Sequence, residues 1–123
     1  MFDLSAEEAR LLLNIALMAT GANRFQSAAK LFAALERFRP DAPSVAVGKA
    51  IALISALQFA ACVEFIDGVA LAKFPGNAML LAFKGMALVR LHRAEDARPV
   101  LERAAEGEDA AAAQLAKGLL ASL

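Results

Sequence analysis

Few side chains in this sequence have the types and spacing that catalysis or metal binding requires. The chain has one cysteine, Cys62, and one histidine, His92, and these two alone cannot form a four-ligand zinc site. Cys62 falls where two helices are expected to pack closely, which predicts a buried thiol rather than a nucleophile or redox sensor. His92 follows Arg90 near a predicted helix end, where a cation complements the helix dipole, with a partner contact as the alternative role. The pattern predicts no catalytic residue and no metal ligand.

Acidic side chains gather at the starts of predicted helices and do not converge on one site. Glu7 with Glu8, and Glu95 with Asp96, precede apolar runs, where negative charge stabilises the first helical turn. The two glycine patterns that cradle phosphates, G-x-G-x-x-G and G-x-x-x-x-G-K-[ST], are both missing from the sequence. We therefore predict a protein that is not an enzyme and that needs no cofactor.

The charges balance and form no strong field. Thirteen basic and thirteen acidic side chains give a formal net charge of zero, whereas nucleic acids and anionic membrane surfaces attract a concentrated positive charge. The densest basic group is interpreted as a solvated face, or as a rim that meets an acidic partner: Arg24, Lys30, Arg37 and Arg39. No nucleic-acid partner is predicted, and function is expected to depend mainly on apolar contacts.

The chain is unusually apolar, yet it lacks the pattern of a membrane or exported protein. Hydrophobic residues make up 59% of its 123 residues and the mean hydropathy is +0.53. The longest charge-free stretch, 50–63, falls short of the ~18 residues that a membrane-spanning helix needs. Asp3 precedes the first apolar run, where a secretory signal would carry Lys or Arg. One cysteine cannot form an internal disulfide, which fits a reducing compartment. Together these features predict a cytoplasmic protein without membrane insertion.

Composition, helix-capping residues and helix breakers together predict an all-α fold. The chain is rich in Ala and Leu, the strongest helix formers, and has no Trp or Tyr. Ser5 and Glu8 have the spacing of a capping box, and Asp109 is a plausible N-cap of the last helix. Pro99 predicts that the sixth helix starts late, near Asp96, so that the proline falls in the first turn. The predicted helices cover 5–20, 25–37, 44–56, 59–73, 78–91, 94–106 and 109–123.

Pairs of helices repeat along the chain. Three positions of the second helix of each pair recur 34 and then 35 residues later: Phe25, Ala28 and Phe32; Phe59, Cys62 and Ile66; and Ala94, Ala97 and Leu101. A small residue recurs in each first helix at the same spacings: Ala16, Ala50 and Gly85. We expect these small residues to let the facing small residue approach, while the bulky residue four places on fills the gap to the next repeat. Two helices per ~34 residues is the tetratricopeptide period.

Over residues 9–106 the sequence therefore resembles the tetratricopeptide repeat family. The resemblance implies a single domain, 1–123, built as an α-solenoid of about three helix hairpins. Its repeats would be about 9–42, 43–77 and 78–108, followed by a capping helix, 109–123. Where the family has a leucine next to the small position, this sequence has Lys49 and Lys84, whose stems are expected to lie on apolar surface.

The resemblance also implies a concave, ligand-binding face lined by the first helix of each repeat. Its apolar members are the candidate partner-binding residues: Leu13, Leu17, Val47, Ile51, Ile54, Met79, Ala82, Met86 and Val89. Its polar members, Arg10, Thr20 and Ser44, include only one cation, which argues against a clamp for an acidic C-terminus. An apolar groove suits an amphipathic helix with anchors at i, i+4 and i+7. The alternative is that these residues pack against the last helix or another copy of the chain.

The segment from Glu8 to Ala34, EARLLLNIALMATGANRFQSAAKLFAA, is similar in size and pattern to small chaperones of bacterial type III secretion. These include the YscG and PscG needle co-chaperones, the YscY type and the short Hrp-associated members. The resemblance implies a cytoplasmic bacterial chaperone, acting alone or beside a second small chaperone. It would cover an amphipathic helix of a secreted or needle subunit until export and so prevent premature polymerisation. The alternative function is a self-associating scaffold, active as a homodimer without a secretion cargo.

Overall fold

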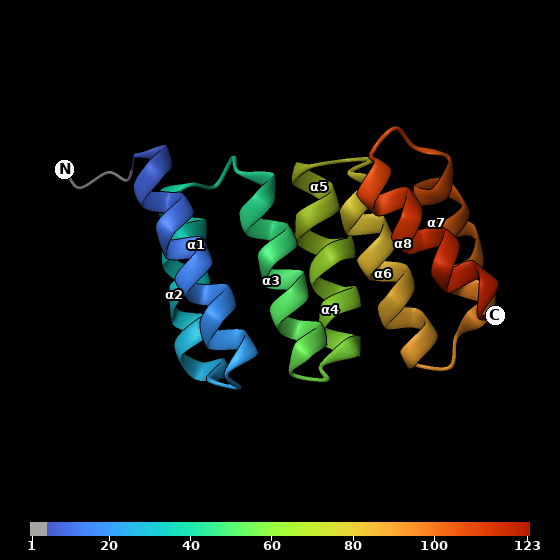
Figure 1. Ribbon diagram of the computed structural model, residues 1–123, viewed down its shortest axis with the longest axis horizontal. Helices are drawn as coiled ribbons and strands as arrows, with labels where there is room; N and C mark the ends of the chain where they lie inside the picture. Colours follow the sequence, from blue (N-terminus) through green and yellow to red (C-terminus); the bar gives the residue numbers. More distant parts are fainter. Residues whose placement is uncertain (1–4) are drawn as a thin grey trace. The chain divides into compact units, whose positions relative to one another are not determined.

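The computed structural model describes residues 5–123, so Asp3 lies outside the described range, and all regular structure within that range is helical (Figure 1). The elements are α1 (Ala6–Gly21), α2 (Phe25–Phe38), α3 (Pro43–Ser55), α4 (Phe59–Phe65), the π-helical turn η1 (Ile66–Ala70), α5 (Leu71–Lys73), α6 (Ala78–Arg90), α7 (Ala94–Glu106) and α8 (Ala110–Ala121). The all-α prediction is confirmed for this range. None of the described helices combines the length and the apolar character needed to cross a membrane. The solenoid arrangement stays a prediction.

The helices group into two compact units, Met1–Leu57 and Gln58–Leu123. The first unit contains α1, α2 and α3, and the second contains α4, η1, α5, α6, α7 and α8. The boundary falls between α3 and α4, inside the predicted repeat 43–77. The two hydrophobic clusters lie in different units, so each unit has its own core. The single domain, 1–123, that the resemblance implies stays a prediction.

The first unit begins with a capping box. The Glu8 backbone N–H donates to Ser5 Oγ at 3.1 Å, and the Ser5 backbone N–H donates to Glu8 Oε1 at 3.1 Å. The bond from the Ser5 backbone also lowers the pKa of Glu8, because it stabilises the ionised carboxylate. The predicted start of this helix is confirmed, and the cap satisfies two N–H groups that the first turn leaves unpaired.

The core of the first unit forms where α2 packs between elements on either side of it in sequence. Phe32 and Leu35 of α2 are almost completely buried, together with Ala16 of α1 and Val45 of α3. Both α1 and α2 contact α3. Since a buried Phe or Leu side chain contributes about 1.5–3 kcal/mol, these two α2 residues are the main hydrophobic anchors of the unit.

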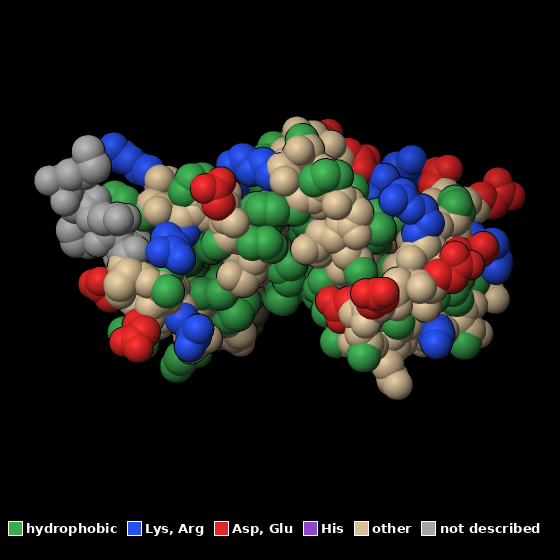
Figure 2. All heavy atoms as spheres, turned by 90° about the horizontal axis from the view of Figure 1, so that it is seen from above, with side chains coloured by type: hydrophobic (Ala, Val, Ile, Leu, Met, Phe, Trp, Pro, Cys, Tyr) green, Lys and Arg blue, Asp and Glu red, His purple; other side chains and the backbone are tan. Residues whose placement is uncertain are grey.

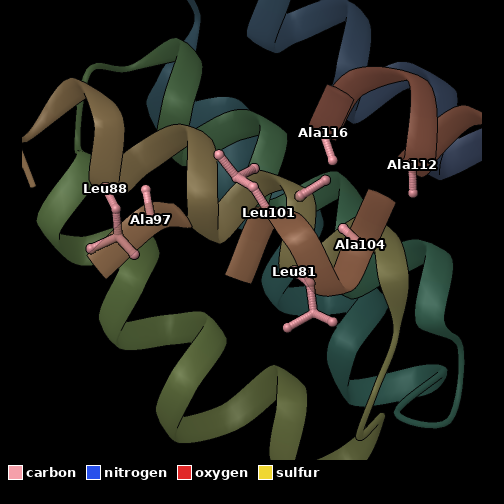
Figure 3. Packing of buried hydrophobic residues seen from close by; sticks show 8 residues of the cluster. Leu81, Leu88, Ala97, Leu101, Ala104, Ala112 and Ala116 are labelled. Carbon is pink, nitrogen blue, oxygen red and sulfur yellow. The ribbon is translucent and has the colours of Figure 1, made fainter. Parts of the chain in front are cut away.

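The core of the second unit is centred on the hairpin of α6 and α7. Figure 3 shows Leu88 beside Ala97 and Leu81 beside Ala104, with Leu101 between the two pairs. Helix α8 packs on both α6 and α7, and its buried small residues are Ala112, Ala113 and Ala116. Small side chains at these positions allow the helix axes to approach closely.

The predicted range of the sixth helix, 94–106, is confirmed, but the late start near Asp96 that Pro99 predicted is wrong. Helix α7 begins at Ala94 and Pro99 lies inside it, beyond the first turn. Proline has no N–H to donate, so the carbonyl of Glu95, four residues earlier, loses its helical partner. Glu95 is exposed, so water can take the place of that bond. An ion pair between Arg93 Nε and Asp96 Oδ2, at 2.9 Å, holds the first turn.

The repeat in the sequence reappears as a repeated backbone conformation. Three non-glycine residues have positive φ: Asn23 (62°), Leu57 (61°) and His92 (60°). They follow α1, α3 and α6, and they are separated by the same 34 and 35 residues as the sequence repeat. Each first helix thus ends in a single left-handed residue. His92 is exposed at this turn. Its position therefore reflects the left-handed turn as well as the end of helix α6.

Replacing Leu57 with glycine is expected to stabilise the protein by about 1 kcal/mol. A left-handed conformation costs a side-chain-bearing residue about 1–2 kcal/mol, and the Leu57 side chain is 67% exposed, so little buried contact is lost. The extra freedom of glycine in the unfolded chain offsets part of the gain. Urea unfolding measures the change. Asn23→Gly is the matched control and should change stability less, because asparagine tolerates this conformation; equal effects would contradict the explanation.

The change of period from 34 to 35 residues has a structural cause. Phe32 and Ile66 are both buried and are separated by 34 residues, but Leu35 has its buried counterpart 35 residues on, at Ala70. Val69, at a spacing of 34, is 45% exposed. The extra residue therefore lies within η1, and a π-helical turn is the usual way in which a helix takes up one inserted residue.

Candidate functional site

Two ion pairs in the described range join neighbouring helices. Lys49 Nζ lies 3.0 Å from Glu36 Oε1 and links α3 to α2, while Lys84 Nζ lies 2.7 Å from Asp67 Oδ1 and links α6 to η1. Nowhere in residues 5–123 do three His, Cys, Asp or Glu side chains lie close enough to hold a metal ion. These ion pairs have a structural role.

The two lysines also confirm the expectation for the positions next to the small residues. The side chains of Lys49 and Lys84 are only 34% and 21% exposed. Their stems are thus mostly covered, as predicted. Each ammonium group pairs with a carboxylate of a neighbouring helix and remains partly exposed.

Cys62 is the buried core thiol that its position predicted. It lies in α4 and is completely buried. Burial raises the pKa of Cys62 to about 11, because the thiolate is poorly solvated there. Since the thiolate is the reactive form, this cysteine stays protonated and unreactive at neutral pH.

In the first unit, the candidate partner-binding residues lie on two adjacent helices. Leu13 and Leu17 of α1, and Val47, Ile51 and Ile54 of α3, are all half-buried. Leu13 and Leu17 pack against the core on one side. Helices α1 and α3 contact each other and run in the same direction along the unit (Figure 1). The structure therefore places large, partly exposed aliphatic side chains on two helices that contact each other.

A cavity of about 350 Å³ lies near the starts of α1 and α3. Three residues assigned from sequence to one concave face, Arg10, Leu13 and Ser44, line this cavity. Arg39, at the end of α2, also lines it, although the repeat pattern gave no signal for this position. Arg10, Leu13 and Ser44 therefore lie around one cavity, and the concave face over both units stays a prediction.

Two members of the predicted concave face are not available at the surface. Thr20 is buried, and its Oγ1 donates to the Ala16 carbonyl at 2.9 Å. Ala82 is completely buried in the core of the second unit. The other α6 residues predicted to bind a partner, Met79, Met86 and Val89, are half-buried. Because α8 packs on α6, the last helix covers part of this helix in the second unit.

Sequence analysis missed the most exposed apolar side chains of α1. Leu11, Ile15 and Met18 are 60%, 42% and 73% exposed. Their spacing of four and then three residues places them on one side of the helix, which we call the α1 stripe. The spacing was visible in the sequence, but the exposure depends on which helices pack nearby.

The visible surface carries no segregation of charge by sign. In Figure 2, basic and acidic side chains alternate over the face shown, with hydrophobic side chains between them. No protein-family model, no curated protein and no solved structure matches this chain. The apolar side chains of the described helices are therefore the candidate functional surface.

Proposed function

We propose that the protein is a chaperone or adaptor that binds an amphipathic helix of a protein partner along α1 and α3. The observation that carries the proposal is the set of half-buried aliphatic side chains on these adjacent helices, Leu13, Leu17, Val47 and Ile51. Leu13 and Leu17 are anchored in the core on one side, which keeps them in place for a partner on the other. Pre-positioned apolar side chains lower the entropy cost of binding.

The spacing of these side chains suits a helical partner. On α1 and on α3, the two apolar residues lie four positions apart and so form a short row on each helix. A partner helix with apolar anchors at i, i+4 and i+7 can place its own row against them. Met79, Met86 and Val89 supply half-buried apolar positions on α6 of the second unit, and methionine adapts readily to different partners.

The resemblance to type III secretion chaperones supplies the partner class. We assign the bound helix to a secreted or needle subunit, and the protein to the bacterial cytoplasm, where such a subunit must stay soluble before export. The apolar character of Leu17 and Ile51 supports this class over acidic peptides, because a carboxylate ligand would need cations at these positions. Covering the helix stabilises the unassembled subunit by mass action.

The binding test uses a fluorescently labelled peptide of the host needle-subunit helix and its scrambled counterpart. The protein should bind the helix and not the scrambled peptide, and Leu17→Glu with Ile51→Glu should weaken binding at least about 100-fold, because two carboxylates would be desolvated. Leu57→Glu is the matched control, since Leu57 is exposed outside these rows. Leu17→Asn provides a milder variant, and circular dichroism checks folding. Equal affinity of the folded variant and the parent would refute the proposal.

A further inference from the structure

Helix α1 has apolar side chains on two of its sides. Leu12 packs against the core of the first unit and Ala16 lies buried within it, yet the α1 stripe, Leu11, Ile15 and Met18, is exposed on another side. Exposed apolar side chains gathered on one side of a helix mark a candidate interaction surface. The 4–3 spacing of the stripe is that of the seam along which two helices pair. The stripe therefore points to a further helix that packs on α1.

Helix α3 shows what covers the same positions elsewhere in the chain. The residues 34 positions after the stripe are Val45, Lys49 and Ala52. Val45 is buried and Ala52 packs against the core of the first unit. Lys49 pairs with Glu36 of α2. At these positions α3 is covered by helix α2, which supplies apolar contacts and one carboxylate.

Helix α6 repeats this arrangement within the second unit. The equivalent residues there are Leu80, Lys84 and Ala87, of which Leu80 and Ala87 are completely buried. Lys84 pairs with Asp67 of the helix that contacts α6. On α1, the middle position is Ile15 instead of lysine, so its cover needs no carboxylate. The stripe fits an apolar helix.

We propose that the α1 stripe packs against the α1 stripe of a second copy of the chain, with the two α1 helices antiparallel. The stripe is self-complementary about a two-fold axis near its centre: Leu11 of one copy then meets Met18 of the other, and the two Ile15 side chains lie near the axis. Exposed Glu7 and Glu8 outnumber exposed Arg10 at the start of the stripe, so this end is net negative, and exposed Arg24 stands beyond the other end. Antiparallel pairing brings opposite charges together, whereas parallel pairing would bring the acidic ends together.

The expected dimer is weak and leaves the proposed helix-binding side free. Three side chains and their flanks bury less than the ~800 Å² per partner of a standard interface, so we expect a Kd on the order of 10 µM or weaker. Leu13 and Leu17 lie two positions from Ile15, which is about 200° around the helix. Pairing of α1 helices is therefore independent of the proposed binding of a partner helix.

Sedimentation equilibrium from about 5 to 500 µM tests the pairing over the expected affinity range. The average mass of the full chain should rise from one chain toward two. Ile15→Glu and Met18→Glu should stay monomeric at the highest concentration, because pairing would bury their carboxylates. Leu57→Glu, in which an exposed leucine outside the stripe is replaced, should still dimerise. A parent protein that stays monomeric throughout, or an Ile15→Glu variant that still dimerises, would overturn the proposal.

A charge exchange tests the antiparallel direction. Replacing Glu7 and Glu8 with Arg should weaken the dimer several-fold, and adding Arg24→Glu to the same chain should restore it, since attraction between opposite ends is regained. In a parallel pair the added Arg24→Glu would not restore the dimer. A failure to restore it would therefore overturn the antiparallel direction. Ile15→Glu should bind the needle-subunit peptide like the parent. Loss of dimer with retained peptide binding therefore separates this proposal from the proposed function.

Discussion

Gly85→Ala is expected to destabilise the second unit by about 2 kcal/mol. A Cβ at this position of α6 would lie 2.5 Å from Leu101 Cγ and would also overlap the adjoining Cδ2. Leu101 is completely buried, so its branch point cannot move aside. Overpacking of this kind costs about 3 kcal/mol, and the higher helix propensity of alanine offsets about 1 kcal/mol of that.

Urea unfolding and hydrogen exchange of α6 and α7 measure the Gly85→Ala effect. Gly118→Ala is the matched control in α8: nothing lies within 4 Å of the added methyl, so a stabilisation of about 0.5–1 kcal/mol is expected. In a Leu101→Ala background, the Gly85 substitution should become neutral or stabilising, because space is then present. A destabilisation that is the same in both backgrounds would rule out a clash with Leu101.

The small residues of the repeat were found from sequence, but the contact between Gly85 and Leu101 was not. The expectation was that Gly85 admits a facing small residue, Ala97, and that Leu101 fills the space toward the next repeat. In the structure, Leu101 lies directly on Gly85. Gly48 has the same kind of role without any signal in the repeat, since a Cβ there would lie 2.8 Å from both Leu13 Cδ1 and a ring carbon of Phe32. A sequence period fixes register but not helix rotation.

Helix ends were predictable where the cap is local. Ser5 caps α1 as predicted, and the Asp109 side chain accepts the Ala112 N–H at 3.0 Å at the start of α8. Pro99 misled the prediction because the cost of a missing hydrogen bond depends on whether water reaches the orphaned carbonyl. That exposure is a property of the folded surface and not of the neighbouring residues in sequence.

In the candidate site, too, sequence predicts local features but not those that depend on neighbouring helices. Sequence identified apolar helix positions, and two of the candidate residues, Leu17 and Ile51, are half-buried. It did not identify which apolar positions are covered: Ala82 is completely buried, whereas Met18 is 73% exposed. Coverage depends on neighbouring helices, and an apolar side chain has the same hydrophobicity whether a neighbour is present or not.

Deletion of Gly68 is expected to leave the second unit folded and within about 1 kcal/mol of its original stability. The deletion removes the extra residue of η1, so Ala70 would stand 34 residues after Leu35 and an ordinary α-helix could run through. Gly68 has no side chain to lose and nothing lies within 4 Å of its Cβ position. Asp67 keeps its place before the deletion, so its pairing with Lys84 is retained.

The matched control is deletion of Ala34, which occupies the equivalent position of α2, where no π-helical turn absorbs a change. Every following residue of α2 would rotate by about 100°. Leu35, now completely buried, would leave the core of the first unit at a cost of about 3 kcal/mol or more. Urea unfolding of both deletions, with hydrogen exchange to assign the unit affected, gives the comparison. If removing Gly68 costs as much as removing Ala34, the π-helical turn is a packing requirement of the second unit rather than an accommodated insertion.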